Sequence, residues 1–430
     1  MPQTNPPNLP NPSEAVPPLP SSAPERSTRE PDLVIVGAGI VGLATARALL
    51  LRHPNLKLTV LDKEAQIATH QTGRNSGVIH SGLYYKPGSL KAKLCVQGSA
   101  AMVRYCEEHG IAQKRCGKVV IAATESELPR LHELYARGQA NGVPGLSLIG
   151  PERLREIEPH AVGLQALHSP NTGIIDYSLV ADSFAREITA LGGVVQTDQE
   201  VTAIEPLGNR VRITTQSEVL EPRFVIVCGG VHADRLAVKS GGPKEPRIVP
   251  FRGDYYVLKP SQRPLINALI YPVPDPNYPF LGVHSTLKMD GSMWLGPNAV
   301  LAFAREGYRR WDVSARDLWD ALRAPGFQKL AWRSWRTGLD ELIRDFSRHY
   351  FVEAAQRFVP ELTTDGVEPG PAGIRAQALT PDGSLVDDFV FDQLGPIIHV
   401  RNAPSPAATS SLPIGQHIAG LATDSFGLGR

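Results

Sequence analysis

A short glycine-rich segment near the start of the chain carries the clearest chemical signal. Gly37, Gly39 and Gly42 form a G-x-G-x-x-G pattern between an apolar run and an Ala/Leu-rich run. The first glycine permits a tight turn, the second lets a pyrophosphate approach the backbone, and the third lets helix and strand pack closely. Asp62 ends a second apolar run twenty residues after Gly42, where an acid accepts hydrogen bonds from ribose hydroxyls. The pattern predicts a dinucleotide site, and a purely structural glycine turn beside a surface acid is the alternative.

The glycines alone do not distinguish FAD from NAD, but three further segments favour FAD. Thr72–Gly82 is small and polar and can thread along an extended cofactor, where a nicotinamide dehydrogenase would continue into a helix. Gly229 follows another apolar run and offers a second close approach of backbone to ligand. Arg401–Thr409 precedes a small-residue helix, whose N-terminus can stabilise negative charge on a reduced flavin. The cofactor-binding residues predicted here are Thr72, Arg74, Asn75, Ser76, Gly77, Gly229, Pro404, Ser405, Ala407 and Thr409.

The elements that must position these residues can be read from hydrophobic periodicity. Asp32–Gly37 and Leu58–Asp62 are continuous apolar runs typical of buried parallel strands, and Ile40 to about Leu51 joins them as a helix. Together they form a βαβ unit. Tyr177–Leu191 is predicted as an amphipathic helix whose apolar positions are Leu179, Val180, Phe184 and Ile188. Further strands are predicted at Val194–Gln196, Val201–Pro206, Val211–Thr215 and Phe224–Cys228.

The remaining segments indicate a second domain. Residues 86–164 are predicted to be mostly helical, and residues 246–365 to hold strands followed by helices around 315–360. These strands are expected near Ile248–Leu258, Phe280–Ser285 and Ser292–Leu295. The predicted fold is α/β (α+β overall), with a Rossmann-like FAD-binding domain from residues 32–85, 165–245 and 366–430. A substrate domain with a mixed or antiparallel sheet, from residues 86–164 and 246–365, is inserted into it. Residues 1–31, rich in Pro, Ser and Asn, are predicted to be a disordered tail.

Composition excludes several classes of protein. The chain has 44 Lys and Arg against 43 Asp and Glu, which argues against a polybasic nucleic-acid binder and against strong electrostatic docking on anionic membranes. Its four cysteines form no C-x-x-C pair, so we expect neither a zinc ribbon nor a disulfide framework, and no metal site. No run of 18 apolar residues occurs, so no transmembrane helix is expected.

Longer motifs identify a family. The segments DLVIVGAGIVGLATARAL, HQTGRNSGVIHSGLYYKPGSLKAKLCVQG, PFRGDYY, GPAGIRAQ and VRNAPSPAATSS closely resemble the L-2-hydroxyglutarate dehydrogenases (oxidases), over about residues 32–422. These are FAD-dependent enzymes of the D-amino-acid-oxidase-like superfamily. The resemblance implies FAD, oxidation of L-2-hydroxyglutarate to 2-oxoglutarate, a metabolite-repair role and an electron acceptor other than NAD. Asp62 departs from the longer Glu that is usual in the superfamily, although it should still reach the ribose.

The implied reaction needs a base. Hydride passes from Cα of a 2-hydroxy acid to flavin N5 while the hydroxyl loses its proton. His80, at the end of the glycine-rich run, and His284, on a predicted inner strand, are both candidates. A buried histidine is more often a hydrogen-bonded structural residue, and the sequence does not choose between the two.

Two substrate carboxylates require cationic partners, for which bidentate arginine is suited. Arg252 and Arg375 both lie beside glycines, and Arg375 is the preferred anchor, because Arg252 has an ion pair with Asp254 as its alternative. Tyr255 is expected to donate a hydrogen bond or to pack. Weaker candidates are Gln71 and Asn298 as polar pocket positions, and Lys91 and Lys93 as solvated helix residues or cofactor contacts.

Partner and location stay partly open. The electron acceptor is a quinone or oxygen, and a quinone would require peripheral membrane contact through a modest apolar patch. The expected location is cytoplasmic, with attachment to the periphery of the inner membrane as an alternative. The substrate could instead be another 2-hydroxy acid, glycerol 3-phosphate or an amino acid. A different class is a non-catalytic, flavin-binding interaction protein whose Pro-rich tail binds the partner.

Overall fold

The computed structural model describes residues 30–275, 281–333 and 347–429. The disordered tail predicted over residues 1–31 lies outside this part except for its last two residues, and so does Phe280 of one predicted strand. All that follows concerns the unit that begins at Pro31.

A six-stranded sheet holds the predicted βαβ unit. Its order is β20-β21-β13-β1-β2-β9, and every pairing is parallel except that of the edge strand β20. All residues of β1 and β2 are buried, as expected for parallel strands that are covered on both faces. The strands are β1 (Leu33–Val36), β2 (Leu58–Leu61), β9 (Val194–Gln196), β13 (Phe224–Val227), β20 (Val390–Leu394) and β21 (Ile397–Asn402).

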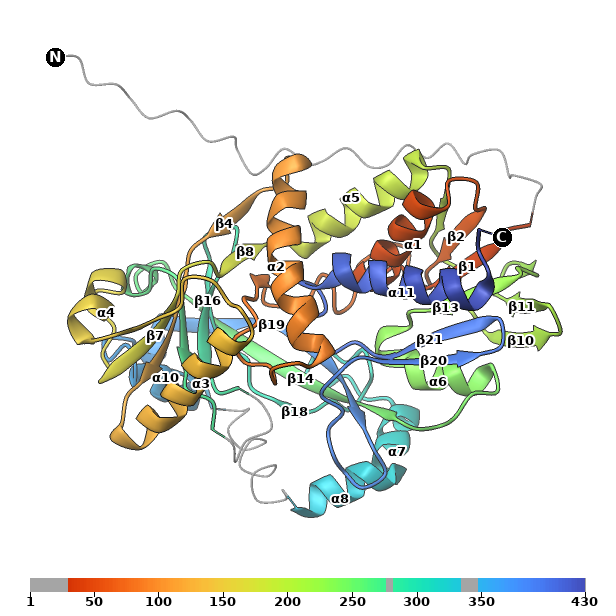
Figure 1. Cartoon of the computed structure of the whole chain (residues 1–430). Coiled ribbons are helices and arrows are strands. Elements are labelled where there is room, and N and C mark those ends of the chain that lie inside the picture. Colours follow the sequence, from red (N-terminus) through yellow and green to blue (C-terminus); the bar gives the residue numbers. More distant parts are fainter. Residues whose placement is uncertain (1–29, 276–280, 334–346, 430) are drawn as a thin grey trace. The chain divides into compact units, whose positions relative to one another are not determined.

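Helices pack closely over this sheet (Figure 1). Helix α1 (Ile40–Arg52) contacts both α11 (Ser411–Phe426) and α5 (Tyr177–Ala190), and α11 also contacts α2 (Leu90–Glu108). Gly415 of α11 explains the close approach, because a Cβ there would lie 2.5 Å from the backbone of Ala44 in α1. The structure therefore confirms the predicted Rossmann-like α/β layering of the described part.

Other sheets form a second group of elements. Strand β14 pairs along most of its length with β19 and joins an antiparallel sheet, while β5 pairs parallel with β15 and antiparallel with β7. The strands are β3 (Val78–Ile79), β4 (Gln113–Arg115), β5 (Lys118–Ala122), β6 (Ser147–Ile149), β7 (Gln165–Ser169), β8 (Gly173–Ile175), β14 (Arg247–Leu258), β15 (Leu269–Pro272), β16 (His284–Leu287), β17 (Met293–Gly296), β18 (Val300–Leu301) and β19 (Val367–Leu379). The helices are α3 (Leu128–Ala140), α4 (Pro151–Ile157), α7 (Ala315–Arg323), α8 (Pro325–Arg333) and α10 (Arg348–Gln356).

Smaller elements complete the described part. Strands β10 (Ala203–Leu207), β11 (Arg210–Thr214) and β12 (Val219–Leu220) form an antiparallel sheet of their own, and α6 (Ala233–Lys239) follows β13. Within the residues that the structure describes, no helix is both long enough and apolar enough to pass through a bilayer.

Some sequence expectations differ from the structure. Residues 86–164 contain the strands β4, β5 and β6 besides their helices, because β5 is a wholly buried strand between sheet neighbours that are distant in the chain. Leu179, predicted on the apolar face of α5, is 41% exposed, whereas its neighbour Val180 is buried. The pairing of β19 with β14 places residues 367–379 beside the second group of strands. The domain boundaries themselves stay a prediction.

Candidate active site

One large cavity, of about 1130 Å³, is bordered by most of the residues singled out in the sequence. It touches the glycine turn, the 69–80 segment, the residues after β13, the β14–β19 sheet and the segment before α11. Of the predicted site residues, those that line it are Gly37, Gly39, Gly42, Asp62, Thr72, Arg74, Asn75, Ser76, His80, Gly229, Tyr255, His284, Arg375, Pro404, Ser405, Ala407 and Thr409. Gly77 and Arg252 are not among its lining residues.

The three fingerprint glycines have three different surroundings. Gly37 adopts φ +109°, and a Cβ there would lie 2.4 Å from the Cys228 carbonyl oxygen. A Cβ on Gly42 would lie 2.0 Å from the Gly37 carbonyl oxygen, so strand and helix touch at this point. A Cβ on Gly39 would meet only the Thr72 hydroxyl, at 3.5 Å, since its other side is the cavity. The backbone at Gly39, which is also the N-cap of α1, is thus left open to a ligand.

Two polar side chains that follow the second strand in sequence accept hydrogen bonds from the backbone of this turn. The Asp62 carboxylate accepts hydrogen bonds from the Ala38 N–H at 2.7 Å and the Glu64 N–H at 2.9 Å, and it lines the cavity. The Thr72 hydroxyl accepts from the Ile40 N–H at 3.0 Å. Asp62 therefore fixes the turn, and each of its oxygens keeps further lone-pair capacity for a ribose hydroxyl.

The 72–77 loop is shaped largely by its own side chains. The Asn75 amide donates to the carbonyls of Gln71 and Thr72 and accepts from the Gly77 N–H. Gly77 has φ +74°, and a Cβ there would lie 2.6 Å from the Ile175 carbonyl oxygen, so this glycine serves strand packing. The prediction that Gly77 contacts the cofactor is not supported, because the residue faces β8 and not the cavity.

The C-terminal segment closes the cavity from the other side. Thr409 accepts from the His80 N–H at 3.1 Å and bonds to the Tyr177 hydroxyl at 2.9 Å. Helix α11 begins two residues later, at Ser411. A long cavity with an open glycine, a helix N-terminus at one end and small residues along its wall suits a phosphate-bearing dinucleotide. The residues present therefore fit FAD.

A cluster of charged side chains lies at the edge of the cavity. The Lys63 ammonium is 2.9 Å from Glu306 and 3.2 Å from His70 Nε2, and it also pairs with Glu64. Burial would raise the pKa of Glu306, but hydrogen bonds from His232 and Lys63 lower it to about 2. Glu64, His70 and Glu306 have the types and spacing of a metal site, yet the Lys63 ammonium already supplies the cation that they surround.

The two predicted arginines point to opposite faces of the β14–β19 pair. Arg375 lies directly opposite Phe251 in the β14–β19 pair, and opposed residues point to the same face of a sheet. Arg252 is the next residue along β14, so its side chain points to the opposite face. There it pairs with Asp254 at 3.0 Å and is 4% exposed. The structure therefore favours the ion pair for Arg252, and of the two arginines only Arg375 lines the cavity.

Arg375 shares its part of the cavity with two tyrosines. Burial lowers the pKa of the Arg375 guanidinium, and the nearby Tyr255 and Tyr271 hydroxyls act in the opposite direction. Burial raises the pKa of Tyr255 to about 12, so the phenol keeps its proton and can donate a hydrogen bond. All three side chains line the cavity and are close enough to influence one another's charge.

Both candidate histidines line the part of the cavity that Arg375, Tyr255 and Tyr271 also line, which is called the chamber below. The His284 Nδ1 is 2.8 Å from the Gly282 carbonyl oxygen, which can only accept, so Nδ1 carries the hydrogen and Nε2 a lone pair. The Nδ1 of His80 is buried without a hydrogen-bond partner among the described residues. Burial, followed by Lys118, His284 and Lys91, lowers the pKa of His80 to about 3. Burial also lowers the pKa of His284 to about 3; the Gly282 hydrogen bond opposes this shift, and Arg375 and Lys118 add to it.

Lys118 is a residue that the sequence analysis missed. It lies in β5, is 2% exposed, and its ammonium has no hydrogen-bond partner within the described ranges. The ammonium lies 4.6 Å from the Tyr84 ring centroid and 4.8 Å from that of Tyr271, and both tyrosines line the cavity. Burial lowers the pKa of Lys118 to about 7. The available signal was a single lysine at the start of the apolar run KVVIA.

Of the four weaker sequence candidates, two line the cavity and two do not. Lys91 is 6% exposed, lines the cavity and pairs with Asp387 at 2.7 Å, whereas Lys93 is exposed on α2. Lys91, in the first turn of α2, is therefore buried and not solvated. Gln71 lines the cavity, and Asn298 instead accepts from the Asp254 N–H.

Comparison with known proteins agrees with this architecture. A family model described as FAD dependent oxidoreductase matches residues 32–421. Among curated proteins, the chain is 51% identical over 416 residues to the mitochondrial L-2-hydroxyglutarate dehydrogenase of Nematostella vectensis, covering 92% of this chain and 91% of the relative. The human protein of the same name is 51% identical over 419 residues, covering 94% and 90%.

Solved structures support the fold. An FAD-bound L-alpha-glycerophosphate oxidase from Mycoplasma pneumoniae superimposes with a TM-score of 0.75 at 21% identity, covering 92% of this chain and 95% of that one. Glycine oxidase from Geobacillus kaustophilus gives 0.69 at 18% identity, covering 93% and 96%. The predicted family, fold class and cofactor are thereby confirmed. This chain belongs to the FAD-dependent oxidoreductases and, within them, to the L-2-hydroxyglutarate dehydrogenase family.

Proposed function

We propose that this chain oxidises L-2-hydroxyglutarate, a small dicarboxylate 2-hydroxy acid, to 2-oxoglutarate. The observation that carries the proposal is the chamber in which Arg375, Tyr255 and two neutral histidines line one cavity with the dinucleotide-binding turn. The names of relatives that are 51% identical over nine-tenths of the chain supply the substrate.

FAD supplies the hydride acceptor when it is bound, and this chain's residues supply the site around it. The open backbone at Gly39 and the N-terminus of α1 would receive the pyrophosphate, and Asp62 would receive the ribose. Ala403–Thr409, immediately before α11, would lie along the flavin end of the cavity.

Cationic and phenolic groups position the substrate. Arg375 is the proposed partner of one carboxylate, with the protonated Tyr255 hydroxyl as an additional donor. Lys91 and Lys118 add positive charge around the same chamber. An apolar competitor would bring no negative charge to these cations, so the chamber selects for a dianion.

The two histidines are the candidates for accepting the hydroxyl proton. The lone pair of His284 lies on Nε2, because Nδ1 is committed to the Gly282 carbonyl. In the chamber without substrate, the low pKa of each ring reflects burial and neighbouring cations. A bound dianion offsets those cations and therefore raises the basicity of both rings at the moment when a base is needed.

The test is anaerobic reduction of the bound flavin by a panel of acids. L-2-Hydroxyglutarate should bleach the flavin absorbance, and D-2-hydroxyglutarate, lactate, glycerol 3-phosphate and amino acids should do so far more slowly. Bleaching by none of them would point to the non-catalytic flavin-binding alternative. Faster bleaching by another member of the panel would assign the chain to that substrate.

The proposal also covers the electron acceptor, the location of the protein and its division into domains. Reoxidation of the reduced flavin by a quinone or by oxygen is to be separated by stopped-flow measurement with each acceptor. We propose that the protein is cytoplasmic and contacts the inner membrane peripherally. The relatives named above are mitochondrial proteins. We keep the division into an FAD-binding domain and an inserted substrate domain, with residues 367–379 reassigned to the substrate sheet because β19 pairs with β14.

A further inference from the structure

Most of the large apolar side chains exposed on α7, α8 and the preceding loop are tryptophans. Trp311 is 80% exposed, Trp319 55% and Trp332 83%. These three are the exposed tryptophans among the described residues. Val313 and Leu322, in the same stretch of sequence, are exposed as well. Scattered apolar residues on a surface are ordinary, whereas a contiguous patch of large ones marks an interaction surface; these side chains lie within some twenty residues of chain, on two helices that contact each other and on the loop before them.

These side chains are not the inner face of the helices. Ala321 of α7, together with Phe327 and Leu330 of α8, packs on Val249 of β14 and Leu379 of β19. Trp319 and Leu322 are three residues apart on α7, and with Ala315 they follow the i, i+4, i+7 spacing of one helix face. Helix α7 therefore has one apolar face buried against the sheet and a second one directed to solvent.

Positive charge surrounds the outward face. Six Lys or Arg stand against three Asp between residues 309 and 333, although the whole chain is nearly neutral. Two of these acids, Asp317 and Asp320, are paired with Arg235 of α6. The Arg323 guanidinium lies 4.2 Å over the ring centroid of Trp319. Of the basic side chains in this stretch, those exposed to solvent are Arg309, Arg316, Arg323, Lys329 and Arg333.

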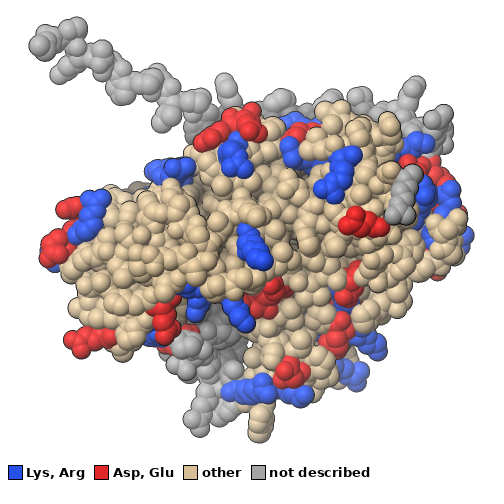
Figure 2. Space-filling view, viewed as in Figure 1, with Lys and Arg blue, Asp and Glu red and all other residues tan. Residues whose placement is uncertain are grey.

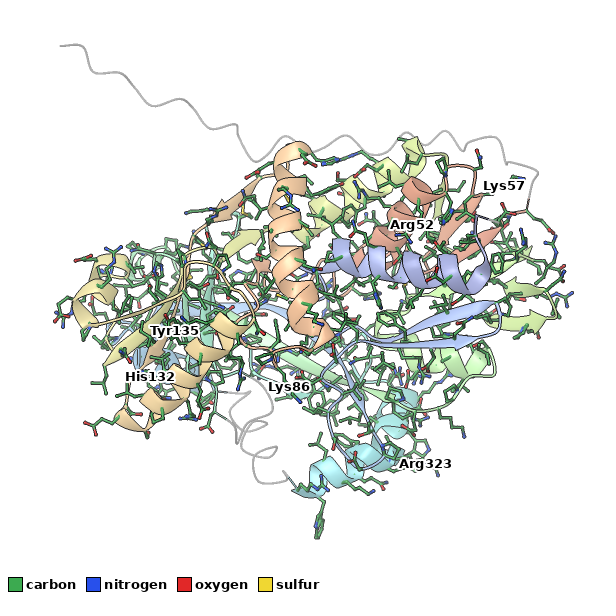
Figure 3. The ribbon with its side chains drawn as sticks, viewed as in Figure 1. Arg52, Lys57, Lys86, His132, Tyr135 and Arg323 are labelled. Atoms are coloured by element: carbon green, nitrogen blue, oxygen red, sulfur yellow. The ribbon has the colours of Figure 1, made fainter. Side chains whose placement is uncertain are left out.

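The figures agree with this placement. Figure 2 shows Lys and Arg side chains over α7 and α8, with acidic side chains among them, at the lower edge of the view. Figure 3 labels Arg323 at the same edge, on the far side of α7 from the six-stranded sheet. The surface is defined here as the exposed side chains Trp311, Val313, Trp319, Leu322, Arg323, Lys329, Trp332 and Arg333.

We propose that this α7–α8 surface docks the protein on a lipid bilayer that contains anionic headgroups. Tryptophan prefers the membrane interface because its ring is apolar and its N–H is polar, and Lys and Arg among such rings attract anionic lipids. The inference rests on the peripheral membrane contact proposed above and gives it a place in the chain.

The test is co-sedimentation of the FAD-loaded, full-length protein with phosphatidylcholine vesicles, with and without phosphatidylglycerol. Binding should require phosphatidylglycerol and weaken as salt is raised, because the charges are solvent-exposed. Replacing Trp319 and Trp332 together by Ser should weaken vesicle binding at least tenfold. The combined changes Arg323→Gln, Lys329→Gln and Arg333→Gln should abolish binding to the vesicles that contain phosphatidylglycerol.

Matched controls lie on the β10–β11–β12 sheet. Leu207→Ser and Val219→Ser remove exposed apolar side chains away from α7 and α8, and they should leave vesicle binding unchanged. All variants should keep their FAD and their turnover with a water-soluble dye, since none of these residues lines the cavity.

The outcomes separate this inference from the proposed reaction. A protein that reduces its flavin with L-2-hydroxyglutarate but binds no vesicles keeps its function and overturns the docking surface. Equal vesicle binding by the tryptophan variant and the controls would also overturn it. Vesicle binding without flavin reduction would leave the docking surface standing and refute the reaction.

Discussion

Replacing Lys118 by Met should make the protein more stable and less active. The ammonium is buried and lies over two tyrosine rings, with no hydrogen-bond partner among residues 30–275, 281–333 and 347–429. Methionine has a similar length and flexibility but no charge, so it fills the same space. A buried charge that lowers stability beside the candidate active site is expected to serve the reaction.

The magnitude follows from the pKa. Burial lowers the pKa of Lys118 from 10.5 to about 7, and a pKa unit corresponds to about 1.4 kcal/mol. Between these two values the unfolded chain holds a proton that the folded chain lacks, so the free energy of unfolding rises with pH. Below pH 7 both states are protonated and the full cost of about 5 kcal/mol applies as an upper value. The stabilisation by Lys118→Met should therefore be largest at or below pH 7 and shrink toward pH 10.

The assay is urea unfolding of the FAD-loaded wild type, Lys118→Met and Lys93→Met at pH 7 and at pH 9.5. Lys93 is the matched control, since it is exposed on α2. Lys118→Met should gain at least about 2 kcal/mol at neutral pH, and should lose at least tenfold in the rate of flavin reduction because the chamber loses a cation. An unchanged or lower stability at pH 7 would refute the reasoning, because it would mean that the ammonium is well solvated or paired.

Three further outcomes are expected. Arg375→Met should lower kcat/KM for L-2-hydroxyglutarate by about 10²–10³ and affect lactate much less, as measured by steady-state kinetics; equal losses would assign Arg375 to the carboxylate that the two acids share. His284→Asn should slow anaerobic flavin reduction without releasing FAD, and an unchanged rate would make His80 the leading base. Gly39→Val should fold normally yet purify without yellow colour, because the new side chain enters the cavity. Gly42→Ala should instead lower the unfolding temperature, since its Cβ would lie 2.0 Å from a carbonyl oxygen. A fully yellow Gly39→Val protein would contradict this placement of the cofactor.

The sequence was sufficient where the determinants are contiguous in the chain. The turn at Gly37 needs a positive φ, and Gly42 needs room beside the backbone of Gly37; both requirements arise within six residues. The parallel strands around this turn could be predicted because strands buried on both faces are apolar throughout. Family motifs extended the same reasoning to the segment before α11.

Only the tertiary structure decided which charged side chains enter the chamber. Arg252 and Arg375 have similar glycine-rich neighbours, but the register between β14 and β19 directs them to opposite faces. Lys118 is unremarkable in the sequence, and its burial arises because β15, from a distant part of the chain, pairs with β5. Trp319 and Leu322 would be assigned to a helix core by periodicity, yet the sheet takes the other face of α7. The physical reason is common to all three: periodicity shows that a face exists, and only a partner that is remote in sequence determines whether that face meets protein, cavity or solvent.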